Sequence, residues 1–247
     1  MAAHEFASLP LATELPPVPW LARLPRARSR WVPPDRVLVH QGERPSHLFV
    51  VEEGVVALTA WESSGRRAVL ALLGPGDAFG EAALFAEADT PSHALLPEAR
   101  VLVPSRVLAV PPEPLRSAVE AHAWLAAWLA LTLARRARRA EERLAWTLGL
   151  TVLERVRAAL QDLAGAYGRP TQEGRLIEVP LTQDFLASLV GATRESVNRA
   201  VRALVRSGAL RRASGHHYLL RSAGPSAEGR LSAAPGRANL RKEPAMR

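Results

Sequence analysis

Hydrophobic positions are spaced in three different ways along this chain, and each spacing predicts a different kind of element. From Arg30 to Val110, short runs of β-branched residues alternate with glycines, which indicates strands and tight turns. From Leu115 to Leu148 the apolar residues recur at helical spacing, without glycine or proline. From Leu181 to Gly208 they outline a pair of short helices joined by a glycine turn. Together these segments predict an α+β protein.

The strand-rich segment consists of apolar runs that glycines separate. Gly42, Gly54, Gly65, Gly74 and Gly76 punctuate it. Short strands at this spacing are typical of an all-β sandwich or barrel. The predicted strands are Arg36–His40, Leu48–Glu52, Val55–Ala60, Val69–Leu73, Val101–Val103 and Val107–Val110.

A heptad seam runs along the long predicted helix. Its side chains repeat at alternating steps of four and three residues, which is the pattern of paired helices. Arg136 interrupts the seam, and one interpretation is that it reaches Glu81 in the strand-rich segment. The other is that the arginines of residues 135–139 form a solvated face balanced by Glu141 and Glu142. The seam positions are Leu129, Leu133, Arg136, Ala140, Leu144 and Thr147.

The chain after the long helix predicts a hinge at Gly149 and a new helix opened by a capping box of Thr151 and Glu154. The buried face of that helix is Leu153, Val156, Leu160 and Leu163, and Gly165 and Gly168 end it. We predict a loop and a short strand over Pro170–Glu178. The two strands of a wing are predicted at Ala209–Arg212 and His217–Arg221.

Residues 181–208 have the pattern of a helix-turn-helix. Thr182 is the predicted N-cap of the first helix, Gly191 ends it, and Thr193 caps the second. Small Ala187 allows the helices to approach closely. The apolar face is Leu186, Leu189 and Val190 on the first helix and Val197, Ala200, Val201, Leu204 and Val205 on the second.

The second helix leaves a polar face outside. Arginine can donate two hydrogen bonds to a guanine edge, and a carboxylate can accept from the cytosine amino group. Arg194, Glu195 and Arg199 lie near the N-terminal end that enters the major groove in such motifs. Arg211 in the wing suits a phosphate contact. The expected DNA-binding residues are Thr182, Thr193, Arg194, Glu195, Ser196, Asn198, Arg199, Arg202 and Arg211.

The segment Thr193–Arg199, TRESVNR, resembles the recognition helix of the cyclic-AMP receptor protein and fumarate–nitrate regulator (CRP/FNR) family. VLVHQGERPSHLFVVEEGVVAL and LLGPGDAFGEAALF resemble its β-roll sensor, a cyclic-nucleotide-binding-like jelly roll. The resemblance implies a C-terminal winged helix-turn-helix and a homodimer paired through the long helix. It also implies a near-palindromic operator with half-sites similar to TGTGA, roughly one helical turn or about 34 Å apart. RNA polymerase is then the expected protein partner.

The resemblance places an effector pocket at Phe79, Gly80, Glu81 and Ser92. Cyclic-nucleotide-binding members hold the cyclic phosphate with an Arg-Ser pair, and those positions fall here on Pro91 and Ser92. A proline carries neither charge nor N–H, so the main phosphate contact is lost. We therefore expect that cyclic AMP is not the ligand, and that Gly80 and Glu81 serve the fold of the β-roll.

Composition favours a nucleic-acid partner. The 247 residues carry a net charge of +8, and of the 32 basic residues only Lys242 is a lysine. The chain has no cysteine, secretory pattern or apolar run long enough for a bilayer, so we expect a cytoplasmic, membrane-free protein. His40 and His47 lack the companions of a cupin metal site. We expect no catalytic residue, metal or cofactor.

The predicted function is that of a sequence-specific transcription regulator that works independently of cyclic AMP. The alternatives are an effector-gated regulator, a β-roll metal or haem enzyme with a DNA-binding appendage, and a structural DNA binder without sequence preference. The predicted divisions are an N-terminal segment 1–24, a sensor 25–112, a helical segment 113–149, a DNA-binding domain 150–221 and a disordered basic tail 222–247.

Overall fold

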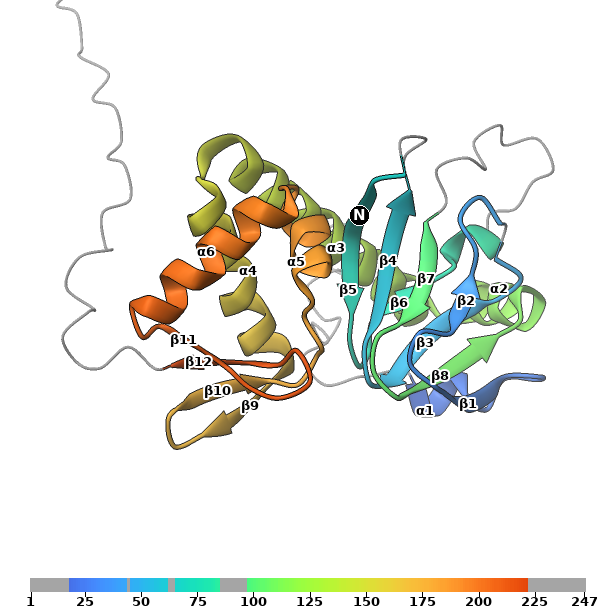
Figure 1. The fold of residues 1–247 in the computed structure, drawn as a ribbon. Helices are drawn as coiled ribbons and strands as arrows, with labels where there is room; N and C mark the ends of the chain where they lie inside the picture. The colour runs from blue at the N-terminus through green and yellow to red at the C-terminus, as the bar shows by residue number, and fades with distance from the viewer. Residues whose placement is uncertain (1–17, 44, 62–64, 85–96, 222–247) are drawn as a thin grey trace, which may run out of the picture.

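The computed structural model describes residues 18–43, 45–61, 65–84 and 97–221 (Figure 1). An N-terminal β-sandwich is joined to a smaller α+β domain by the long helix α3 (Ala123–Gly149). This is the predicted architecture. The predicted basic tail, most of the N-terminal segment, and Pro91 and Ser92 lie outside the described residues.

Two antiparallel four-stranded sheets form the sandwich. The first has the order β1 (Arg28–Val32), β8 (Ser105–Val110), β3 (Leu48–Glu53) and β6 (Ala78–Phe79). The second has the order β2 (Val37–Val39), β7 (Glu98–Val101), β4 (Val56–Trp61) and β5 (Arg67–Leu73). Phe49, Val56 and Phe79 belong to the apolar cluster between them. A turn of 3₁₀ helix, η2 (Glu81–Ala83), follows β6.

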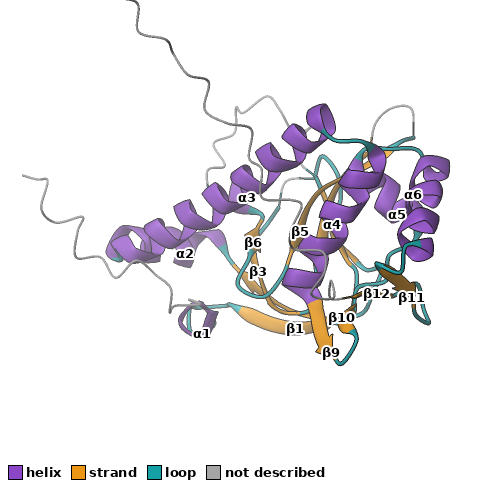
Figure 2. Ribbon diagram, turned by 90° about the vertical axis from the view of Figure 1, so that its left-hand side faces the viewer, coloured by secondary structure: helices purple, strands orange, loops and turns teal. Residues whose placement is uncertain are grey.

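Helices cover the outer faces of both sheets (Figure 2). Leu48 and Val50 of β3 pack with α1 (Val18–Leu21), α2 (Pro112–Ala121) and the first half of α3, whereas Phe49 and Val51 point into the sandwich. Strands that are buried on both faces are apolar at successive positions, which explains the run LFVV. On the second sheet, Val69 and Leu72 belong to the core of the C-terminal domain.

The C-terminal domain is a winged helix-turn-helix. It contains α4 (Val152–Tyr167), the hairpin β9 (Gly168–Thr171) and β10 (Gly174–Ile177), α5 (Gln183–Val190), α6 (Arg194–Arg206), and the wing strands β11 (Leu210–Arg212) and β12 (Tyr218–Arg221). Its sheet has the order β11-β12-β10-β9. The predicted capping box is confirmed. Thr151 Oγ1 donates to Glu154 Oε2 at 2.7 Å and Thr151 N donates to the same oxygen at 2.8 Å, and these two bonds lower the pKa of Glu154.

Strand predictions failed where polar residues hide the pattern. β1 was not predicted because Arg28, Ser29, Arg30 and Trp31 are all exposed, and the strand is defined by its pairing with β8. β7 begins at Glu98, three residues before the predicted start, where Glu98 pairs with Thr59 of β4. The sequence did not indicate this because Glu98 is acidic; its buried carboxylate forms an ion pair of 2.9 Å with Arg100. The two-residue strand β6 was also missed.

Some helix predictions also need correction. α4 continues through Gly165 to Tyr167, because its hydrogen bonds and packing outweigh the cost of one glycine. Leu153 and Val205, which we expected to be buried, are 41% and 37% exposed. The predicted loop and single strand after α4 are the complete hairpin β9–β10.

Among the described residues, no single helix is long and apolar enough to cross a membrane. α2 and α3 reach the required length and composition only as a pair, which bends by 112°. The apolar residues Leu115 and Leu125 of this pair lie in the core over the first sheet.

Replacing Gly80 with alanine should destabilise the protein more than the same change at Gly76. Both glycines have a positive φ, of 82° and 87°. A Cβ at Gly80 would lie 2.5 Å from the carbonyl oxygen of His47, whereas Gly76 faces open space. We expect Gly80→Ala to lower the free energy of unfolding by about 3 kcal/mol, and Gly76→Ala by about 1 kcal/mol. Urea denaturation measures both, and equal losses would mean that the approach to His47 imposes no constraint.

Candidate nucleic-acid interface and sensor pocket

The helix-turn-helix is held by the caps that the sequence predicts. The hydroxyl of Thr182 accepts from Phe185 N at 3.1 Å, and that of Thr193 accepts from Ser196 N at 3.3 Å. Gly191 ends α5 in the left-handed region, with φ 62° and ψ 49°. These contacts fix where α6 starts, and therefore which of its side chains face outward.

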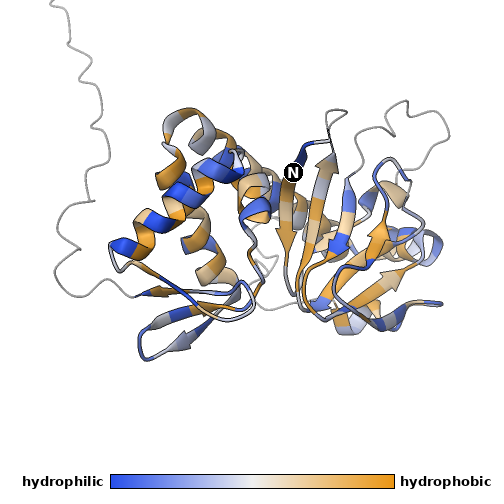
Figure 3. Ribbon diagram, viewed as in Figure 1, coloured by the Kyte–Doolittle hydropathy of each residue, from blue (hydrophilic) through white to orange (hydrophobic). Residues whose placement is uncertain are grey.

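Helix α6 is strongly two-sided. Val197, Ala200, Val201 and Leu204 are buried against the rest of the domain. Arg194, Glu195, Arg199 and Arg202 are exposed on the opposite side, where Figure 3 shows hydrophilic bands alternating with hydrophobic ones along the helix. The side chains that we expect to contact bases therefore lie on one accessible face of α6.

The expected base-contacting side chains of α6 have different hydrogen-bond and ion-pair partners. Arg194 Nη1 lies 3.4 Å from Asp184 Oδ2 of α5, and Arg199 donates to Ser196 Oγ over 3.0 Å. Asn198 is half-buried and accepts from Gln183 Nε2 at 3.2 Å. Gln183 was not predicted as part of this surface, because only the fold brings α5 beside the middle of α6.

The wing adds a second basic element beside α6. Arg211 is exposed and lies 3.2 Å from Glu173 in the turn of the β9–β10 hairpin. Arg206 at the end of α6 and Arg212 are also exposed. Exposed ion pairs contribute little stability, so Arg211 can leave Glu173 for a phosphate at small cost.

The sensor contains a cavity of about 380 Å³ beneath α3. Phe79, Gly80 and Glu81 of the expected effector pocket line it, together with Leu133 and Arg136 of α3. The described part of the wall is mainly apolar, and its charged residues are Glu43, Glu81 and Arg136. Carboxylates therefore outnumber guanidinium groups in that part of the wall.

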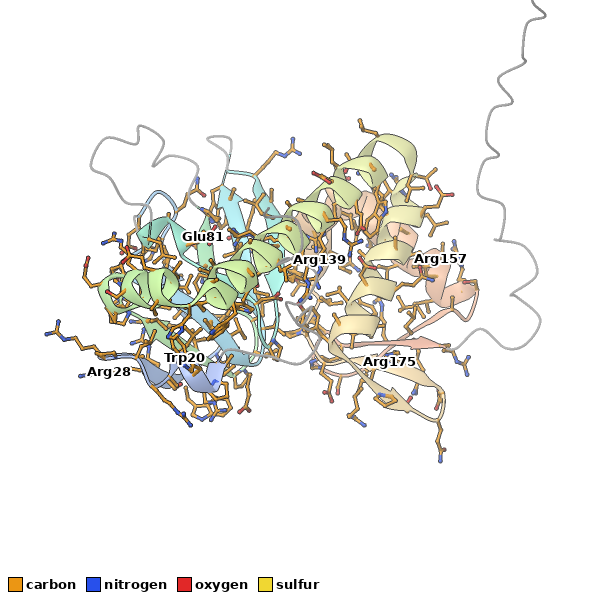
Figure 4. All side chains as sticks on the ribbon, turned by 180° about the vertical axis from the view of Figure 1, so that it is seen from behind. Trp20, Arg28, Glu81, Arg139, Arg157 and Arg175 are labelled. Carbon is orange, nitrogen blue, oxygen red and sulfur yellow. The ribbon has the colours of Figure 1, made fainter. Side chains whose placement is uncertain are left out.

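Arg136 bridges the long helix and the sensor. Its Nη2 donates to Glu81 Oε1, its Nη1 lies 3.4 Å from Glu81 Oε2, and the same Nη1 reaches the carbonyl of Ala78 at 3.5 Å. Figure 4 shows Glu81 close to α3. The contact between Arg136 and Glu81, one of two interpretations open from the sequence, is confirmed.

The predicted seam of α3 contains packed and exposed positions. Leu129 is buried in the sensor core and Arg136 is bound to Glu81, so both are committed to their own chain. Leu133 and Ala140 line the sensor pocket together with Arg136. Leu144 and Leu148, further along the helix, are 61% and 83% exposed. The heptad pattern did not distinguish these positions, because all of them follow helical spacing.

The histidines and acidic residues form no metal centre in the described part of the chain. Within the described ranges, no group of three or more His, Asp or Glu side chains is arranged to hold a metal ion. His40 is exposed, and the Nδ1 of His47 lies 2.8 Å from Ser46 Oγ. His93 lies outside the described residues.

Comparison with known families matches both domains. Residues 29–122 match the model of the cyclic nucleotide-binding domain, and residues 154–223 match the Crp-like helix-turn-helix domain. The chain is 32% identical over 181 residues to a CRP-like cAMP-activated global transcriptional regulator of Mycobacterium tuberculosis. The alignment covers 72% of this chain and 78% of the relative. The chain is 31% identical over 184 residues to the cyclic AMP receptor protein of Thermus thermophilus, covering 74% and 80%.

Solved structures have the same fold. A c-di-GMP-responsive global regulator of Xanthomonas campestris, CLP, aligns with a TM-score of 0.69 at 23% identity, over 84% of this chain and 99% of that one. A CRP/FNR-family transcriptional regulator of Thermus thermophilus aligns with a TM-score of 0.65 at 25% identity, over 79% and 94%. The chain belongs to the CRP/FNR family. It is a transcription regulator with a helix-turn-helix DNA-binding domain.

The pair of Glu81 and Arg136 should show a larger coupling energy than an exposed pair on the same helix. Both side chains are about three-quarters buried, with 28% and 26% exposed. A double-mutant cycle with Glu81→Gln and Arg136→Gln should give about 1–2 kcal/mol in the free energy of unfolding. The exposed i,i+4 pair Arg138–Glu142 is the control and should give at most about 0.5 kcal/mol. Equal couplings would contradict a structural bridge.

Proposed function

We propose that this regulator binds a near-palindromic operator as a homodimer and does so without cyclic AMP. In this proposal the chain has three functional parts, which are the sensor 25–112, the helical segment 113–149 and the DNA-binding domain 150–221. The observation that carries the proposal is the ion pair between Glu81 and Arg136, because it joins sensor and long helix with groups of the chain itself.

Base recognition is assigned to the exposed face of α6. Arg194, Glu195 and Arg199 lie in its first two turns, where a recognition helix meets base edges. The guanidinium of Arg194 suits guanine, and the carboxylate of Glu195 suits the cytosine amino group. The pair between Arg194 and Asp184 is no obstacle, because both side chains are mostly exposed and such a pair is weak.

The homodimer is assigned to a partly exposed stripe of α3, whose first residues also line the sensor pocket. Leu133, Ala137, Ala140, Leu144 and Leu148 follow one another at steps of three and four, so they form a single stripe along the helix. Leu144 and Leu148 are large and exposed, and a second copy of the helix would bury them. Two-fold symmetry then presents both α6 helices to the same side of a duplex.

Independence from cyclic AMP rests on charge. A cyclic nucleotide brings a negative phosphate, and the described wall of the sensor pocket offers one guanidinium, which Glu81 already holds. The arginine that family members use for the phosphate is replaced by Pro91. Such a phosphate would therefore meet excess negative charge in the described part of the wall.

The remaining assignments follow from the class of protein. The regulator works in the cytoplasm, where its operator lies, and RNA polymerase is its protein partner. The M. tuberculosis relative is named a global transcriptional regulator and the T. thermophilus relative a cyclic AMP receptor protein, and we assign no catalytic residue to this chain.

Operator binding without a ligand tests the proposal directly. A labelled duplex with two inverted TGTGA half-sites, centred about 34 Å apart, is titrated with the protein at physiological salt. We expect binding at least about a thousandfold tighter than to a scrambled duplex, with two chains per duplex. Added cyclic AMP should leave the affinity unchanged.

The outcomes separate the candidate functions. Selective binding that requires cyclic AMP would replace our proposal by the effector-gated regulator. Equal affinity for both duplexes would contradict recognition of this operator. Selective binding by one chain per duplex would contradict the homodimer alone.

Replacing the readers of α6 should change base preference, whereas replacing the wing arginine should not. We expect Arg194→Ala and Glu195→Ala each to cost about 1–3 kcal/mol in operator binding and to relax the preference at one base pair. Arg211→Ala should weaken binding to operator and scrambled duplex by the same factor. A competition assay over all single-base variants of the half-site measures this. An unchanged preference after Arg194→Ala would contradict its assignment.

A further inference from the structure

A cavity of about 750 Å³ lies where the sensor, the long helix and the DNA-binding domain meet. Its walls come from β5, α3, α4 and α5, so both domains contribute. It adjoins the sensor pocket at Leu70 and Arg136, but most of its wall is separate from that pocket. Figure 4 shows Arg139 of α3 between the two domains, surrounded by nitrogen-bearing side chains. We call this cavity the interdomain cleft.

Arg143 is the first group in the interdomain cleft that lacks adequate partners. Burial lowers its pKa, although a guanidinium stays protonated at neutral pH. Within the described part of the chain it donates one hydrogen bond, from Nη1 to the carbonyl of Leu70 at 3.2 Å, and forms no ion pair within 4.0 Å. A guanidinium has five N–H donors, so most of its donor capacity is unused in a partly desolvated site.

Arg139 and Tyr167 add further donors to the cleft. Arg139 lies one helical turn before Arg143 and reaches Asp77 Oδ2 only at 3.8 Å. The Asp77 carboxylate already accepts from Gly74 N at 2.9 Å. Burial raises the pKa of Tyr167 to about 12, with Asp77 acting in the same direction, so the phenol stays protonated and can donate.

The positive charge of the cleft is only partly neutralised. Arg138 is paired with Glu142, and Arg136 with Glu81. Asp162 faces Arg143 and offsets part of its charge; burial raises the pKa of the Asp162 carboxyl, whereas Arg143 lowers it. Arg155 completes the set: it donates to the carbonyls of Val190 and Gly191, while its buried Nε has no partner among the described residues.

Apolar surface lies beside these donors. Trp146 follows Arg143 by three residues and lines the cleft from the same helix. Leu72 of β5 and Leu189 of α5 form part of the opposite wall. A site that combines guanidinium groups with an indole ring suits a flat molecule that carries a negative group.

We propose that the interdomain cleft binds an aromatic anion, whose charged group lies between Arg139 and Arg143 and whose ring lies against Trp146. The volume accommodates a molecule the size of a nucleotide. Because β5 belongs to the sensor and α4 and α5 to the DNA-binding domain, the ligand contacts both. The site does not depend on the operator, and it shares only Ala140 and Leu144 with the dimer stripe proposed above.

Isothermal titration calorimetry of the full chain without DNA tests this site. Adenosine monophosphate supplies ring and phosphate, adenosine the ring alone and inorganic phosphate the charge alone, while salicylate carries a carboxylate in place of the phosphate. At least one of the two aromatic anions should bind at least about tenfold more tightly than adenosine and phosphate. Comparison of these two anions tells whether phosphate or carboxylate is the preferred group.

Matched variants locate the binding. Arg143→Gln should weaken binding of the preferred anion at least about tenfold. Arg139→Gln, whose side chain is half exposed, should weaken it as well and serves if Arg143→Gln fails to fold. Arg135→Gln, an exposed arginine of the same helix outside the cleft, should leave it unchanged.

Two results would overturn the proposal. One is that neither anion binds more tightly than adenosine and phosphate. The other is that Ala82→Leu, which narrows the sensor pocket, abolishes binding while Arg143→Gln and Arg139→Gln retain it. The second result would place the ligand in the sensor pocket.

Discussion

The sensor sheets are apolar on both faces, and the rest of the molecule is arranged around covering them. One outer face is buried by α1, α2 and the start of α3, and the other by α4 and α5. The DNA-binding domain therefore packs directly on the sensor. It shares Val69 and Leu72 with the sensor in one continuous core, so its orientation relative to the sheet is stabilised by hydrophobic burial.

Ion pairs add direction to this hydrophobic packing. Burial alone is non-directional, whereas the contact between Arg136 and Glu81 ties one position of α3 to one position of the sensor. In the proposed mechanism these groups do from within the chain what an effector would otherwise do from outside. The side chains of α6 then depend on ordinary helix chemistry, since Thr193 and Gly191 decide which of them are exposed.

Predictions from the sequence were correct where one residue type meets one structural requirement. Gly191, Thr182 and Thr193 each specify a helix end, and the stripe from Val197 to Leu204 specifies a buried face. The predictions failed where tertiary context decides. The exposed strand β1 exists only because β8 offers a partner, and the pairing of Asn198 with Gln183 requires two helices to meet. Likewise, no local pattern reveals that Leu129 is buried against the sensor whereas Leu144 is largely exposed.

The bridge between Arg136 and Glu81 also has a consequence for how such a regulator can evolve. Glu81 lies in the wall of the sensor pocket and Arg136 lies on the long helix, so a substitution at either residue alters the pocket and the helix contact together. Under the proposed function, an arginine at position 91 would not by itself release Glu81 from α3. We therefore expect the pocket wall and the long helix of such a regulator to change jointly during evolution.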